Sequence, residues 1–90
     1  MKKQEFIIEL GGIIGTIQTY TRNPFMNGYT KELKKAVTHN DLETTKIALD
    51  KVIGWYEEQI DKINNDEYVF NKEMHAKAYH ILHEFRHSIG

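Results

Sequence analysis

Residues 41–63 read DLETTKIALDKVIGWYEEQIDKI, and this segment carries the strongest helix signal in the chain. Apolar or small side chains recur there every three or four positions, which places them on one face of a helix. The residues on that face are Leu42, Thr45, Leu49, Val52, Tyr56, Ile60 and Ile63. Asn40 is the expected N-cap, with Glu43 three positions later as in a capping box. The pattern predicts a long amphipathic helix.

Downstream, a second helix is predicted over residues 71–88. Its apolar stripe has the same period and consists of Met74, Ala78, Ile81, Leu82, Phe85 and Ile89. The polar run at residues 64–66 interrupts the periodicity between the two helices. Because a short connection makes consecutive helices antiparallel neighbours, a helical hairpin is expected.

Upstream of residue 41, the segment 22–28 (RNPFMNG) predicts a turn. The residue before a proline is pushed out of helical geometry, and Asn-Gly favours a turn. A shorter helix is expected over residues 31–39, with Thr30 as its N-cap. Its predicted buried side consists of Leu33, Ala36 and Val37.

The N-terminal segment, residues 5–20, has two readings. Its apolar residues share one side of a helix, and they are Phe6, Leu10, Ile13, Ile14, Ile17 and Tyr20. Three glycines oppose a helix, since each costs about 1 kcal/mol relative to alanine. A β-hairpin turning at Gly11-Gly12 is the alternative, and the periodicity favours the helix.

Together these segments predict one all-α domain spanning residues 1–90, a small antiparallel bundle of three long helices and one short helix. The chain has no cysteine, which fits a reducing compartment. Nothing approaches the run of about 20 apolar residues that spans a bilayer. We therefore expect no membrane span and a cytoplasmic location.

Charge argues against nucleic acid as a partner. The formal net charge is −1, from 12 basic and 13 acidic residues, and no basic block occurs. No paired carboxylates, phosphate-binding glycine loop or cofactor motif stands out either. By elimination we expect a non-enzymatic protein-interaction module, a small regulator, inhibitor or adaptor that binds a partner of unknown identity through a helix face. A homodimer is one form that this interaction could take.

One motif suggests an enzyme. His83-Glu84-Phe85-Arg86-His87 fits H-E-x-x-H and resembles the zinc-binding helix of metallopeptidases, in which two histidines hold zinc and the glutamate acts as general base. A catalytic zinc needs a third protein ligand, usually downstream, and only residues 88–90 follow. On the helical wheel both histidines point away from the apolar stripe. We therefore expect no catalytic residue here.

The histidines still form a strip of their own. His80, His83 and His87 are three and four positions apart, so they lie on one exposed side of the last predicted helix. A solvated polar face is the simplest interpretation, helped by the favourable interaction of histidine with a helix C-terminus. The alternatives are a surface metal site at these three histidines and a pH-responsive interface.

Candidate partner-binding residues are aromatic or large and apolar. They are Trp55 on the flank of the long helix, Phe25 and Met26 in the proline segment, and Tyr68 and Phe70 before the last helix. Burial in a small core would explain each of them. Exposure would instead make them anchors for a protein partner.

A charged helical bundle of this size without cysteine resembles the cytoplasmic bacteriocin immunity proteins. The resemblance covers size, composition and helical architecture rather than a motif. It implies binding to a specific toxin and protection of the cell that makes the protein.

Overall fold

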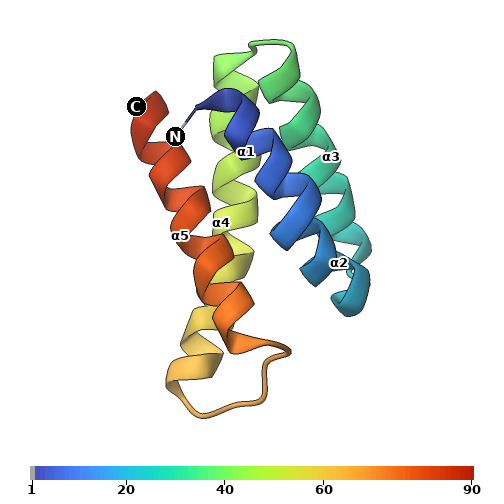
Figure 1. Cartoon of the computed structure of the whole chain (residues 1–90), viewed down its shortest axis with the longest axis vertical. Coiled ribbons are helices and arrows are strands. Elements are labelled where there is room, and N and C mark those ends of the chain that lie inside the picture. Colours follow the sequence, from blue (N-terminus) through green and yellow to red (C-terminus); the bar gives the residue numbers. More distant parts are fainter. Residues whose placement is uncertain (1) are drawn as a thin grey trace.

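Helices make up all the regular structure of residues 2–90, the part of the chain that the computed structural model describes (Figure 1). The elements are α1 (Lys3–Glu9), η1 (Leu10–Ile14), α2 (Gly15–Thr21), α3 (Pro24–Thr38), α4 (Leu42–Asn64) and α5 (Lys72–Ile89). η1 is a π-helical turn that joins α1 to α2 without a break, and the three together are called the N-terminal helix below. The predicted all-α class is confirmed.

The N-terminal helix confirms the helical reading of residues 5–20, and the hairpin alternative is wrong. Phe6, Leu10 and Ile14 follow one another at intervals of four residues, and all are buried. In a regular α-helix of about 3.6 residues per turn, a spacing of four drifts around the axis. The wider π turn offsets this drift. The ring of Phe6 stacks on that of Phe85 in α5, with centroids 3.8 Å apart, and this contact holds the N-terminal helix against α5.

α3 begins at Pro24, so the predicted turn over residues 22–28 and the N-cap at Thr30 are wrong. The Asn23 side chain caps the helix by accepting hydrogen bonds from the backbone N–H groups of Phe25 (3.0 Å) and Met26 (3.3 Å). Proline fits the first helical position, where its missing N–H would have no partner anyway. The helix predicted to be short is therefore 15 residues long.

α4 begins one residue later than expected, because Asp41 and not Asn40 is its N-cap. The Asp41 carboxylate accepts hydrogen bonds from the backbone N–H (3.1 Å) and the hydroxyl (2.8 Å) of Thr44. These bonds favour the ionised form and lower the pKa of Asp41. Asn40 has a φ of +58° and turns the chain between α3 and α4. The proposed capping box with Glu43 is consequently wrong.

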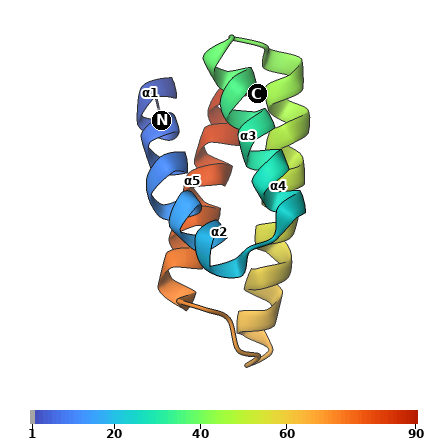
Figure 2. The same ribbon diagram turned by 90° about the vertical axis from the view of Figure 1, so that its right-hand side faces the viewer.

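α5 agrees with the predicted last helix. The Asn71 side chain accepts a hydrogen bond from the backbone N–H of Met74 (3.1 Å) and starts the helix. Figures 1 and 2 show α4 between α3 and α5, with the N-terminal helix lying across α3 and α5. In residues 2–90 no helix combines the length and apolar character needed to cross a membrane.

The core draws on every one of these helices. Its largest buried side chains are Phe6, Ile14, Ile17, Met26, Leu33, Leu49, Val52, Tyr56, His75 and Leu82. Two polar atoms inside it, the Tyr56 hydroxyl and His75 Nε2, have no hydrogen-bond partner within residues 2–90. Burial raises the pKa of Tyr56, because the phenolate would be poorly solvated there.

Candidate functional site

The five predicted partner-binding residues are placed very differently. Phe25 and Tyr68 are 73% and 87% exposed, whereas Met26 is 1% exposed and belongs to the core. Trp55 and Phe70 are half-buried. Met26 is buried because α3 starts at Pro24, which turns a supposed loop residue toward the helix's inner side. Phe25 and Tyr68 are therefore the members most accessible to a partner.

Phe25 and Trp55 meet at a shallow depression of about 360 Å³ between α3 and α4. Tyr29 lies one helical turn after Phe25 and also lines it, and Lys51 Nζ stands 5.3 Å from the centre of the Tyr29 ring, in cation–π range. Gly54 lines it from α4. We call Phe25, Tyr29, Lys51, Gly54 and Trp55 the α3–α4 surface.

Trp55 anchors this surface to the core. Its indole lies edge-on to the ring of Tyr56, with centroids 4.8 Å apart and planes at 89°. It also lies 5.9 Å from the imidazole of His75 in α5. Edge-to-face aromatic contacts of this kind restrict the rotation of the side chain. The indole is thus held in place while part of it faces solvent.

Gly54 stands in the middle of α4 without a packing reason. Leaving aside its two chain neighbours and the nearby helix backbone, a Cβ atom at this position would meet no atom of residues 2–90 within 4 Å. Glycine in a helix interior costs about 1 kcal/mol relative to alanine. The missing side chain instead leaves the depression beside Trp55 open.

Tyr68 and Phe70 belong to another part of the molecule. Phe70 stacks on Tyr20 of α2, with ring centroids 4.4 Å apart, and so ties the segment before α5 to the N-terminal helix. Neither Tyr68 nor Phe70 lines the α3–α4 depression. The structure therefore brings Phe25 and Trp55 together and leaves Tyr68 and Phe70 outside their surface.

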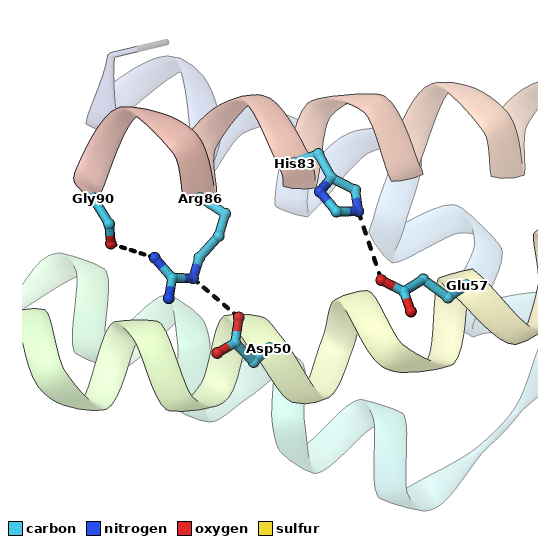
Figure 3. Close-up of polar contacts among 5 residues, drawn as sticks. All are labelled: Asp50, Glu57, His83, Arg86 and Gly90. Atoms are coloured by element: carbon cyan, nitrogen blue, oxygen red, sulfur yellow. Dashed lines mark hydrogen bonds and ion pairs between the residues drawn. The ribbon is translucent and has the colours of Figure 1, made fainter.

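The histidine strip lies on the exposed side of α5. His80 Nε2 is 3.8 Å from Glu84 Oε2. His83 Nε2 is 3.8 Å from Glu57 Oε1 on α4, and Figure 3 shows this pair. His87 is exposed as well. Within residues 2–90, no three histidine, aspartate or glutamate side chains are grouped in a way that could hold a metal ion. His83 is thus directed to a carboxylate on the neighbouring helix.

A second side-chain pair follows along the same boundary. Arg86 Nε donates to Asp50 Oδ1 at 3.0 Å, and the Arg86 guanidinium also donates to the carbonyl of Gly90 (Figure 3). We call the pairs Arg86–Asp50 and His83–Glu57 the α4–α5 seam. Arg86 and Asp50 bring opposite charges together there, and His83 stands near a carboxylate, so side chains of α4 and α5 meet at the surface.

Sequence reasoning missed Tyr29 and Gly54. Tyr29 is four positions after Phe25 and would share its helix face, but only if the helix starts at Pro24. The signal was the Asn23-Pro24 pair, which fits an N-cap followed by a first-position proline as well as it fits a turn. Gly54 could have been noticed as a glycine inside an otherwise regular helical pattern.

Comparisons with known proteins give the chain a relative but no family. It is similar to the uncharacterized protein YddK of Bacillus subtilis (strain 168), with 28% identity over 85 residues. The similarity covers 94% of this chain and 31% of the relative, so the chain spans about a third of that protein's length. No family model matches the sequence, and no solved structure matches it.

Proposed function

We propose that this chain is a non-enzymatic protein-interaction module that binds one partner protein through the α3–α4 surface. The observation that carries the proposal is Phe25, a large apolar side chain that is 73% exposed on a regular helix and stands beside an open depression. Aromatic anchors in or beside a pocket contribute much of the binding energy of protein interfaces. Asp50, Lys51 and Glu58 also line the depression, and charged residues are usual at the rim of such surfaces.

Gly54 supports the same proposal. Its conformational cost is not repaid by a close contact within the chain, and it keeps the depression open next to the fixed indole of Trp55. A side chain of the partner that enters this depression would contact Trp55 and Tyr29. The lack of cysteine suits a reducing cytoplasmic setting.

Photo-crosslinking tests the surface directly. The crosslinking analogue p-benzoylphenylalanine replaces Phe25 in one version of the chain and Ile8 in the other, and each is exposed to lysate of the source cells. Ile8 is the matched control, because it is 72% exposed on α1, away from the α3–α4 surface. We expect one protein to be captured from position 25 and not from position 8.

Two further variants sharpen this test. In a pull-down without the crosslinker, Phe25→Ser should abolish retention of the captured protein, whereas Ile8→Ser should leave it intact. Gly54→Ala should weaken capture while stabilising the helix by about 1 kcal/mol. Equal capture from positions 8 and 25 would contradict the proposal, and capture of a second copy of the chain would replace it with a homodimer.

A further inference from the structure

The flank of α3 opposite the α3–α4 surface borders a groove of about 470 Å³. Its other wall is the N-terminal helix, and Figure 2 shows α2 and α3 diverging from the short connection that joins them. Three cations line it, Arg22 from the end of α2 and Lys31 and Lys34 from α3. We call this the α2–α3 groove.

No carboxylate of residues 2–90 lines the groove beside these cations. Lys31 and Lys34 are three positions apart on one helix, where like charges repel each other. Single unpaired lysines are common on protein surfaces, so the convergence of three cations from two helices is the informative feature. It produces a positive local field in a chain whose formal net charge is −1.

Arg22 occupies a backbone position that disfavours it. It is the C-cap of α2 with a φ of +50°, in the left-handed region where glycine is the usual residue. An arginine there keeps a cation at the mouth of the groove at a conformational cost that glycine would avoid. The folded chain gains no ion pair from it among the residues described.

The floor of the groove supplies polar and apolar contacts. Gln18 is 5% exposed, and its side-chain Nε2 donates a hydrogen bond to the hydroxyl oxygen of Thr30 across the groove. Because Thr30 accepts this bond, its own O–H can donate to a ligand. Leu10 and Pro24 add apolar surface. This combination suits carboxylates carried on an aliphatic chain.

We propose that the α2–α3 groove binds an acidic segment of a protein partner, with its carboxylates opposite Arg22, Lys31 and Lys34. No aromatic residue of the described part of the chain lines the groove, so bases would have no ring to stack on and a peptide fits better than a single-stranded nucleic acid. This site is independent of the α3–α4 surface, because it uses the other flank of α3. It can hold even if the proposed function fails.

Nuclear magnetic resonance titration of the whole ¹⁵N-labelled chain tests the proposal. The probes are a short synthetic peptide in which glutamate alternates with serine and leucine, its glutamine counterpart, and a single-stranded oligonucleotide of equal charge. We expect saturable binding of the glutamate peptide with a Kd of about 1 mM or lower. The amide shifts should centre on Arg22, Thr30, Lys31 and Lys34, and the glutamine peptide should cause none.

Two triple variants with the same charge change separate a local site from a general field. Arg22→Gln, Lys31→Gln and Lys34→Gln together should weaken binding about tenfold or more. The control, Lys62→Gln, Lys72→Gln and Lys77→Gln, removes exposed lysines that do not line the groove and should change the Kd by less than about twofold. Circular dichroism verifies that both variants remain folded, and Arg22→Gly alone provides a second variant whose backbone is relaxed.

Several outcomes would overturn the proposal. They are equal weakening in both triple variants, shifts centred outside the groove, no saturable binding, and tighter binding of the oligonucleotide at the same residues. Shifts that appear when the chain is concentrated without peptide would assign the groove to a second copy instead. Failure of crosslinking at position 25 would leave this result untouched.

Discussion

The α4–α5 seam and the α2–α3 groove are both boundaries between two helices, yet they distribute charge in opposite ways. At the seam, Arg86 meets Asp50 at 3.0 Å and His83 meets Glu57 at 3.8 Å. Arg22, Lys31 and Lys34 all line the groove, and no carboxylate of residues 2–90 lines it with them. The side-chain pairs of the seam link α4 to α5, whereas the like charges of the groove form no such pair between its helices.

The comparison indicates which features of a small helical bundle point to binding rather than to stability. Exposed ion pairs contribute only about 0–1 kcal/mol each, so the seam stabilises the fold only slightly. A cluster of like charges lowers the free energy of unfolding, because the charges repel one another. Arg22 and Gly54 lower stability and make no compensating contact within residues 2–90. Residues of this kind are the better indicators of a partner.

The largest effect should come from detaching the N-terminal helix, which forms one wall of the groove. Phe85→Ala removes the ring that stacks on Phe6 at 3.8 Å, and we expect a loss of about 3–5 kcal/mol in the free energy of unfolding. Denaturant unfolding measures it. Ile8→Ala, on the exposed side of α1, is the control and should cost less than about 0.5 kcal/mol. A similar loss in both variants would mean that the ring contact does not hold the wall in place.

The next effect concerns the buried side of the boundary between α4 and α5. Tyr56→Phe removes a hydroxyl that finds no hydrogen-bond partner in the described part of the chain, and we expect the protein to become more stable by about 1–2 kcal/mol at neutral pH. Burial raises the pKa of Tyr56 above its ordinary value of 10.0, so wild-type stability should be intact below that pH and fall as the pH rises past it. The variant should lose less stability above pH 10. Thermal unfolding at several pH values measures both effects. A destabilised variant would show that the Tyr56 hydroxyl makes a favourable interaction in the folded protein.

Arg22→Gly separates the effect of Arg22 on stability from its effect on binding. Glycine accepts the φ of +50° without strain, so we expect unchanged or higher stability, by up to about 1 kcal/mol. Binding of the glutamate peptide should weaken at the same time, because the cation at the mouth of the groove is gone. Calorimetric unfolding combined with peptide titration measures the two together. A clear loss of stability would show that Arg22 stabilises the fold. Its backbone conformation would then no longer indicate a binding role.

The smallest effect is expected at the seam itself. Asp50→Asn breaks the pair with Arg86 and should cost about 0.5 kcal/mol, with the loss shrinking at high salt because salt already screens the pair. Asp61→Asn, which alters another exposed acidic residue of α4, is the control for net charge. Chemical unfolding at low and high salt measures the difference, and a loss that salt leaves unchanged would contradict an electrostatic origin.

Periodicity predicted most of the fold but not the ends of its helices. Leu49, Val52 and Tyr56 are buried as the helix pattern requires, whereas Leu42 on the same face is 52% exposed because it opens α4 at the end of the bundle. The start of α3 was missed because a proline both breaks a helix and begins one, and its local sequence does not distinguish these roles. His75 lies fully buried in the core although histidine is often exposed, and only tertiary packing determines that.

The candidate sites could be predicted only in part. Phe25 and Trp55 were identified as aromatic candidates, but their meeting at one depression depends on how α3 packs against α4. The groove was not foreseen at all. Its residues come from both sides of Pro24. The predicted helix over residues 31–39 included Lys31 and Lys34, but it left Pro24, Asn27 and Thr30 outside the helix that they share with these lysines.

The π turn at Leu10–Ile14 fixes the angular phase between the two halves of the N-terminal helix. The first half directs Phe6 to Phe85 in α5, and the second half directs Gln18 to Thr30 in α3. Deleting one residue from the turn would rotate one half against the other by about 100°. The shortened chain could then keep the aromatic stack or the polar floor of the groove, but not both. The π turn thus keeps residues at intervals of four on one side of the helix, and that side contacts both α5 and α3.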